Sequence, residues 1–343
     1  MRRFRITALA AAIALAACGS PRPATVPGPT VPAPTGPAPA AAWAQFRHLP
    51  GVVDLAGPRG DGSFVVAAAG RLFILGRDGA LTPFARGAGG YQTKTGTEPY
   101  LVTVDDVAVP GDHCAFPAGA AFAIEPGPRP AVIMISPAGR ARRLASLPAG
   151  SSLTGIAFDA TGRFGHKLLV TAGLQGKTTV FGVGCDGRPS PVTTDGPPVE
   201  GGIVVAPATF GAFGGDLIAP NETSGRVYAV SPSGQVVILA TSGRPAGGDI
   251  GVESAGFVPA AGAVAYLADR VSPGNKHPGD DAILRLPAAA LTRAGIRAGD
   301  LLVATEGGAQ TIDVRCTATC AVRYVAAGPA IAHAEGHIVF LSS

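Results

Sequence analysis

Charge is scarce in this chain, because Asp, Glu, Lys and Arg together make up 15% of its 343 residues, where about a quarter is usual. Basic residues do not cluster beyond Arg140, Arg142 and Arg143, which leaves no broad positive face for nucleic acid. The patterns H-E-x-x-H and G-x-S-x-G are missing, and no glycine loop has the spacing that holds phosphates. The sequence therefore indicates neither a nucleic-acid partner nor one of these common reaction centres.

No apolar run of the chain is long enough to span a bilayer, but a shorter apolar run stands at its start. The run from Ile6 to Ala17 follows the cationic residues Met1-Arg-Arg-Phe-Arg and ends in small residues before Cys18. This order is typical of a secretory signal peptide. The Arg2-Arg3 pair lacks the rest of a twin-arginine pattern, so we expect the general export route.

The segment Leu15-Ala16-Ala17-Cys18 resembles the lipobox of bacterial lipoproteins. The resemblance implies that residues 1–17 are removed and that Cys18 carries diacylglycerol, whose acyl chains hold the protein to the membrane. We therefore expect a protein of the bacterial cell envelope, lipid-anchored on the extracytoplasmic side. An ordinary signal peptide cut nearby, or a plain apolar anchor, is the alternative.

Residues 18–42 are rich in proline and small side chains and offer no apolar face to bury. Such a segment is extended at about 3.1 Å per residue, so it would lift a domain up to roughly 70 Å from the lipid. We interpret it as a disordered linker and place the folded domain at residues 43–343. Loss of Arg2, Arg3 and Arg5 with the leader would lower the formal net charge from +4 to +1.

Cysteine is also rare, with five in the chain. Apart from Cys18 the number is even, which permits two disulfides in an exported protein, in any of three pairings. Cys316 and Cys320 flank a predicted hairpin, so we pair them, and Cys114 is left to pair with Cys185. A zinc site is the alternative, but C-x-x-C pairs are missing.

Short β-type runs separated by turn residues fill the rest of the sequence, and long helical periodicity is nearly absent. The runs come in groups of four with a period of about 40 to 50 residues, which is typical of a β-propeller. We predict an all-β fold with six four-stranded blades. Their first strands lie near Val52, Leu101, Gly155, Gly202, Val252 and Gln310. Residues 43–48 or 337–342 would close the ring, and a β-sandwich is the alternative fold.

Two of these groups carry the motifs Gly155-Ile-Ala-Phe-Asp-x-x-Gly and Gly225-Arg-Val-Tyr-Ala-Val-Ser-Pro-Ser-Gly. They resemble the six-bladed propellers of the gluconolactonase, strictosidine synthase and NHL-repeat superfamily, over most of residues 50–343. In the gluconolactonase family the metal ligands include glutamate in E-G-P, asparagine in N-G-[IL]-A and aspartate in D-G. Glu200-Gly201 matches the first in part, Thr154 stands at the asparagine of the second, and the third has no counterpart at a blade start.

A propeller site is expected on the central axis, where the innermost strands of all blades begin. Carboxylates that face each other there hold a hard cation, normally calcium. We predict Glu200, Asn221 and Glu253 as ligands of an axial cation, with calcium as the one candidate cofactor. Further acids stand at blade starts, namely Asp105, Asp106, Asp249 and Glu335. The alternative is that these side chains cap turns or bind backbone amides.

Residues 271–281 form an insertion that we assign to blade 5 and that could cover the axial opening as a lid. The pattern of residues 287–295 predicts one short helix. Because the enzyme motifs match only in part, we expect a membrane-tethered, monomeric propeller that binds a small molecule, a glycan or an envelope protein. The alternative is an extracytoplasmic hydrolase or lyase of gluconolactonase or strictosidine synthase type that uses the axial cation.

Overall fold

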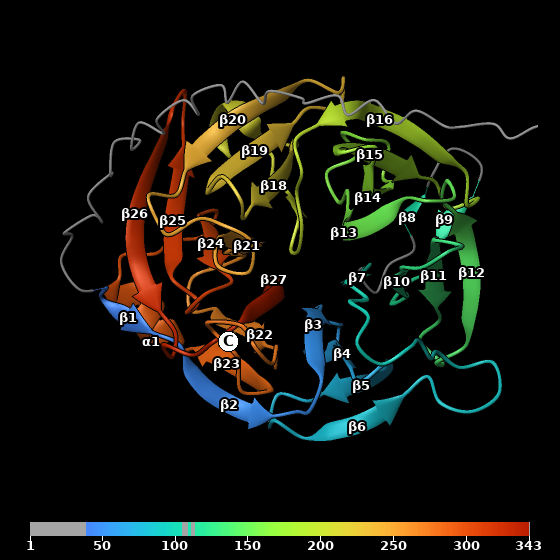
Figure 1. The fold of residues 1–343 in the computed structure, drawn as a ribbon, viewed down its shortest axis with the longest axis horizontal. Helices are drawn as coiled ribbons and strands as arrows, with labels where there is room; N and C mark the ends of the chain where they lie inside the picture. Colours follow the sequence, from blue (N-terminus) through green and yellow to red (C-terminus); the bar gives the residue numbers. More distant parts are fainter. Residues whose placement is uncertain (1–38, 105–108, 111–113, 343) are drawn as a thin grey trace, which may run out of the picture. The chain divides into compact units, whose positions relative to one another are not determined.

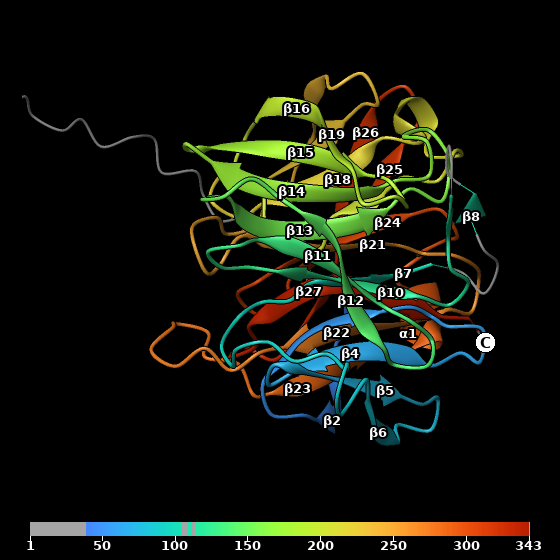
Figure 2. The same cartoon turned by 90° about the vertical axis from the view of Figure 1, so that its right-hand side faces the viewer.

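The computed structural model describes residues 39–104, 109–110 and 114–342, all within the compact unit Gly36–Ser343. The predicted signal peptide, Cys18, and Asp105 and Asp106 lie outside these residues. Within them the β-type runs of the sequence form strands, and six sheets of these strands surround a central axis as blades of a β-propeller (Figure 1). Figure 2 shows the same ring from the side. The all-β, six-bladed fold predicted from the repeats is confirmed.

Blades 1 to 4 are antiparallel and follow the chain, each with its first strand innermost. Blade 1 has β3 (Val52–Ala56), β4 (Phe64–Ala68), β5 (Arg71–Leu75) and β6 (Leu81–Phe84). Blade 2 has β7 (Leu101–Thr103), β10 (Ala121–Glu125), β11 (Ala131–Ile135) and β12 (Ala141–Ser146). Blade 3 has β13 (Ser152–Phe158), β14 (Leu168–Leu174), β15 (Lys177–Val183) and β16 (Pro189–Gly196). Blade 4 has β17 (Val204–Val205), β18 (Leu217–Asn221), β19 (Arg226–Val230) and β20 (Val236–Thr241).

One turn type joins the third and fourth strands in all four of these blades. In each, a backbone N–H reaches the carbonyl four residues ahead, and a glycine in the left-handed region stands one residue before that carbonyl. A three-residue loop that ends in a left-handed residue is a standard hairpin connection, and glycine is the residue that adopts it without strain. The glycines are Gly79, Gly139, Gly187 and Gly234, with φ of 82°, 77°, 79° and 82°. These turns are a large part of the repeat that the sequence shows.

Blades 5 and 6 exchange strands (Figure 1). Blade 5 has β21 (Val252–Phe257), β24 (Leu301–Thr305), β25 (Thr311–Cys316) and β26 (Cys320–Ala327), with β1 (Ala41–Ala42) parallel to β26. Blade 6 has, from the axis outward, β27 (Ala334–Leu341), β22 (Val264–Asp269), β23 (Ala282–Leu286) and β2 (Ala44–His48). The chain thus leaves blade 5 after β21, forms two strands of blade 6, and passes helix α1 (Ala288–Arg293). It then returns to complete blade 5 before it enters blade 6 again as β27.

This exchange corrects two sequence predictions. The run after Gln310 is β25, the third strand of blade 5, and the innermost strand of blade 6 is β27. The insertion 271–281 joins β22 to β23, so it belongs to blade 6 and not to blade 5; it projects from the ring in Figure 2. Counting strands in chain order assumes that each blade is continuous in sequence, and blades 5 and 6 are not. Both predicted closing segments are used, one as the outermost strand of blade 6 and the other as its innermost.

Apolar side chains fill the spaces between blades. Blade 1 packs on blade 6 through Leu55, Phe64 and Tyr266, and burial of each such side chain contributes roughly 1.5–3 kcal/mol. At the closure, Trp43 is 3% exposed and packs between blades 5 and 6. Its indole Nε1–H donates to Thr311 Oγ1 over 2.8 Å. No helix among the described residues is long and apolar enough to cross a membrane.

Both disulfides have the predicted pairing. Cys114–Cys185 links the segment between β8 (Val109–Pro110) and β9 (Ala115–Phe116) to the turn between β15 and β16. Cys316–Cys320 closes the hairpin of β25 and β26. The predicted short helix is α1, and one further turn of 3-10 helix, η1 (Gly211–Phe213), precedes β18.

Candidate axial site

Ionisable side chains gather where the innermost strands begin. We call the following residues the axial cluster: Glu98, Tyr100, Glu200, Glu253, Arg270, Glu306, His333 and Glu335. Five of them are carboxylic acids, against one guanidinium and one imidazole. Most are buried, and buried ionisable groups with shifted pKa values in one place indicate a functional site.

Tyr100, Glu253 and Glu335 form the centre of the cluster. The Tyr100 hydroxyl lies 3.1 Å from Glu253 Oε1 and is hydrogen-bonded to Glu335 Oε1. A phenol has one proton to donate, so one of the two carboxyl groups must donate in return. Burial, and then the charge of Glu335, raises the pKa of Glu253 well above its usual value. Glu253 is therefore the protonated partner. The carboxyl groups of Glu253 and Glu335 can together give and accept a proton.

Arg270 is the cation of this group. It forms ion pairs with Glu98 and with Oε2 of Glu335, the latter over 3.2 Å. Even so, burial and the nearby charge of Glu335 raise the pKa of Glu98. One guanidinium does not neutralise the acids around it.

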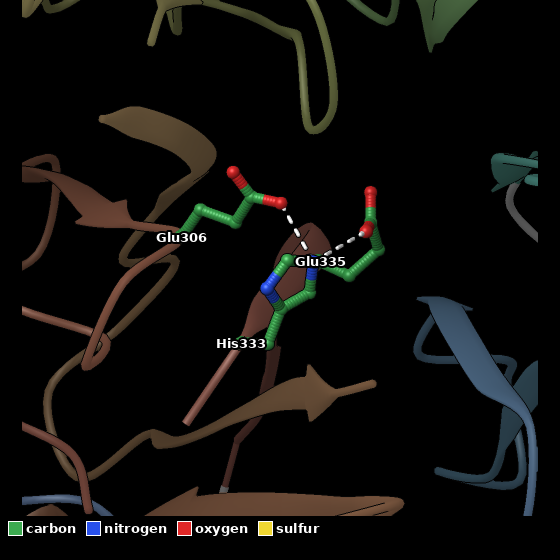
Figure 3. Close-up of side chains that lie close together, drawn as sticks. All are labelled: Glu306, His333 and Glu335. Atoms are coloured by element: carbon green, nitrogen blue, oxygen red, sulfur yellow. Dashed lines mark ion pairs between the residues drawn. The ribbon is translucent and has the colours of Figure 1, made fainter. Parts of the chain in front are cut away.

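His333 lies between two carboxylates (Figure 3). Its Nε2 is 2.7 Å from Glu306 Oε1 and 4.0 Å from Glu335 Oε2, and the three side chains are between 2% and 6% exposed. Burial raises the pKa of Glu306 to about 7. Burial would lower the pKa of His333, but the hydrogen bond and charge of Glu306 raise it above its usual value. Oε2 of Glu306 and Nδ1 of His333 are buried without a hydrogen-bond partner among the described residues.

The predicted cation ligands are only partly brought together. Glu253 lies inside the cluster, and Glu200 lies half-buried at its edge, where burial and then Glu98 raise its pKa to about 8. Asn221 lies apart: its Nδ2 donates to the Pro198 carbonyl, and its Oδ1 accepts from Ser224 N–H and Oγ–H over 2.7 and 2.6 Å.

The Asn221 side chain thus holds a turn, as the alternative interpretation proposed. With Glu200 it lines a pocket of 190 Å³ between blades 3 and 4. A calcium site on Glu200, Asn221 and Glu253 therefore stays a prediction. Asp249 is exposed, and its backbone N–H donates to Glu222.

Sequence reasoning missed His333 and Glu306. The signal was the order His333-Ala-Glu335-Gly-His337, in which polar side chains alternate with small residues in an otherwise apolar segment. Residues two apart in a strand face the same side, so this alternation turns polar groups toward one surface. For Glu306 no comparable signal exists, since only the return of the chain to blade 5 brings it to the axis.

His337 lies deeper on the axis and connects four blades. Its Nδ1 is 2.9 Å from Asp54 Oδ2, and its Nε2 is 3.0 and 3.2 Å from the carbonyl oxygens of Ile156 and Ile203. Carbonyls only accept, so Nε2 carries a proton. Burial would lower the pKa of His337, but the charge of Asp54 raises it. The ring is therefore an imidazolium paired with the Asp54 carboxylate.

Gly336 allows this close packing. Its φ is +68°, and a side chain there would collide with the carboxylate of Asp54. Asp54 also accepts the backbone N–H groups of Leu101 and His337 over 2.6 and 2.7 Å. Glycine after Glu335 thus lets the strand turn its backbone toward blade 1.

The opposite ends of the inner strands line an open apolar pocket of 370 Å³, with His337 in its wall. Side chains from the strand ends of all blades line it, among them Leu55, Val102, Phe158, Val205, Phe257 and Phe340. The axis therefore has an acidic end and an apolar end.

The insertion 271–281 lies next to the axial cluster. His277 packs against Gly307, the residue after Glu306, and its Nδ1 lies 2.7 Å from the Ala330 carbonyl oxygen. Whether this segment moves as a lid stays a prediction.

No protein-family model matches the chain, and no curated protein matches it. Among solved structures it is similar in fold to virginiamycin B lyase from Staphylococcus aureus, with 11% identity, a TM-score of 0.43, and coverage of 82% of this chain and 89% of that one. A gluconolactonase from Xanthomonas campestris has 16% identity and a TM-score of 0.39, with 66% of this chain and 68% of that one covered. At this level of similarity, neither protein assigns an activity to the chain.

Proposed function

We propose that this protein is a lipid-anchored, monomeric propeller of the bacterial cell envelope, whose axial cluster binds a small, positively charged ligand. The observation that carries the binding function is the charge imbalance of the cluster, five buried or half-buried carboxylic acids against Arg270 and His333. Burial of acids without enough cations costs stability, and their raised pKa values show this cost. A cation that replaces the protons on these acids relieves it.

The test is thermal unfolding of the purified full-length protein with pairs of probes that differ in charge. Organic amines and divalent cations are compared with neutral analogues of the same size. A ligand bound only by the folded state raises the melting temperature. We expect the charged probes alone to do so, less in Glu335→Gln and unchanged in Glu125→Gln, which alters an acid of blade 2 outside the cluster. Equal responses to neutral probes, or no response to any, would contradict the proposal.

The membrane anchor is proposed from the lipobox at Cys18. A Cys18→Ser variant removes the sulfur that takes the lipid. We expect the parent to partition into the detergent phase of a two-phase extraction and the variant to stay in the aqueous phase. Aqueous partitioning of the parent would remove the anchor and leave the ligand-binding part intact.

Catalysis by a hydrolase or lyase is the second candidate, and one observation favours it. A protonated Glu253, which shares the Tyr100 hydroxyl with Glu335, can act as general acid. Lactone and ester substrates provide the test. Turnover by the parent that is lost in Glu253→Gln, with the fold retained, would establish an enzyme.

A further inference from the structure

We propose that Glu306, His333 and Glu335 bind a divalent transition metal, with Zn²⁺ as the ion that fits best. This inference rests on the proposed function in one respect, that the cluster takes up positive charge. It shares no ligand with the predicted calcium site of Glu200, Asn221 and Glu253.

The geometry of the three side chains suits a small ion. One nitrogen or oxygen of each lies within 4.8 Å of the others. Zinc with bonds of about 2.0–2.1 Å places tetrahedral ligand atoms about 3.4 Å apart. The distances of 2.7 and 4.0 Å from His333 Nε2 to Glu306 Oε1 and Glu335 Oε2 lie on either side of that value. A small rotation of the side chains completes three corners of a tetrahedron, and the fourth stays free for a ligand.

An unpaired atom gives an independent reason to expect an ion here. Buried polar atoms in proteins almost always have a partner. In the part of the chain that the structure describes, Glu306 Oε2 has none, although the Glu306 side chain is 6% exposed. The protein groups therefore do not satisfy this cluster by themselves.

Backbone pairing holds the ligands in place before any ion binds. The N–H of Ala334 donates to the Glu306 carbonyl over 2.8 Å, and the N–H of Arg270 donates to the His333 carbonyl over 2.8 Å. The N–H of His333 donates to Asp269 Oδ1 over 2.9 Å. A fixed backbone lowers the entropy that is lost on binding, which favours tight coordination.

The donor set selects the metal. Imidazole with carboxylates suits zinc and other transition metals, whereas calcium takes six to eight oxygen ligands. Two carboxylates also balance the charge of a dication. Binding displaces the proton between His333 Nε2 and Glu306. Arg270 competes for Glu335 Oε2, but its second partner, Glu98, keeps the guanidinium paired when Glu335 turns to the metal.

The test uses full-length protein freed of metal by a chelator, with calorimetry for Zn²⁺ and visible absorption for Co²⁺. We expect one ion per chain and a Co²⁺ spectrum of tetrahedral type. Glu306→Gln and His333→Ala should each weaken binding at least tenfold. Glu125→Gln and His166→Ala, which alter an acid of blade 2 outside the cluster and a histidine of blade 3, should bind as the parent does. Circular dichroism verifies the fold of each variant. If His333→Ala does not fold, metal binding by the near-isosteric Glu306→Gln alone tests the site.

The outcomes separate the metal site from the proposed function. No stoichiometric Zn²⁺ or Co²⁺ binding, or equal binding by the parent and Glu306→Gln, overturns the metal site. If organic amines still raise the melting temperature in that case, the proposed function stands without the metal. If neither metal nor amine binds, both proposals fail. Stoichiometric binding that is lost in both variants supports the site.

Discussion

At the scale of single residues, Glu200 links stability to pH. Its pKa rises from 4.5 to about 8 on folding, so the folded chain binds more protons than the unfolded chain between these values. Stability from this group is therefore present at low pH and is lost as the pH rises toward 8. We expect urea unfolding with a chelator present to show a smaller loss of stability between about pH 5 and about pH 8 in Glu200→Gln than in the parent. An identical pH dependence in the two proteins would argue against this assignment.

His337 should be the most costly single side chain on the axis to remove. His337→Ala leaves the buried Asp54 carboxylate without its partner, a loss of about 3–5 kcal/mol for pairs of this kind. His48→Ala, at an exposed position in β2, is the control and should change stability by less than about 0.5 kcal/mol. Urea unfolding at neutral pH measures both. A loss below about 1 kcal/mol for His337→Ala would mean that the imidazolium pair is not formed.

Single residues also show where the sequence was informative. Glu253 could be placed near the axis, because it stands at the start of a recognisable inner strand. Asn221 could not be distinguished from a metal ligand, because an amide that caps a turn and an amide that binds a cation have the same local sequence. His333 and Glu306 come together only through strand pairing between residues distant in sequence, which no local pattern records.

At the scale of elements, the two disulfides should differ in their effect. They join residues 71 and 4 positions apart. A longer closed loop restricts the unfolded chain more, so removal should cost roughly 4 kcal/mol for Cys114→Ser/Cys185→Ser and roughly 2 kcal/mol for Cys316→Ser/Cys320→Ser. Guanidinium unfolding of the two double variants measures the difference. Equal losses would show that the unfolded chain between Cys114 and Cys185 is already ordered without the bridge.

Elements in blades 1 to 4 were predictable because each apolar run ends at a turn with its own glycine signal, such as Gly139 or Gly234. The same signals identified strands in blades 5 and 6 but not the sheet that each strand joins. Partner choice there depends on the exchange after β21, and β22 and β24 are similar apolar runs that fit either blade. Local sequence therefore determines the strands, and packing determines the blades.

At the scale of the whole molecule, Trp43 reports on ring closure. It is the single tryptophan and lies between blades 5 and 6, next to the strands that join the two ends of the domain. Because the ring has no free seam, we expect closure and blades to be lost together. Trp43 fluorescence and far-ultraviolet circular dichroism should then give one coincident urea transition. A fluorescence change at lower urea than the dichroism change would show that the closure opens first.

The exchange between blades 5 and 6 also orders events in time. A chain made from its N-terminus can assemble blades 1 to 4 as they emerge. Blade 6, however, needs β2 from near residue 44 and β27 from residues 334–341, and blade 5 takes its last strands only after two strands of blade 6 have been made. The first strands of the domain, β1 and β2, therefore join their sheets only after most of the chain has been made. A propeller with this connectivity completes its ring, and with it the axial cluster, only after nearly the whole chain has been made.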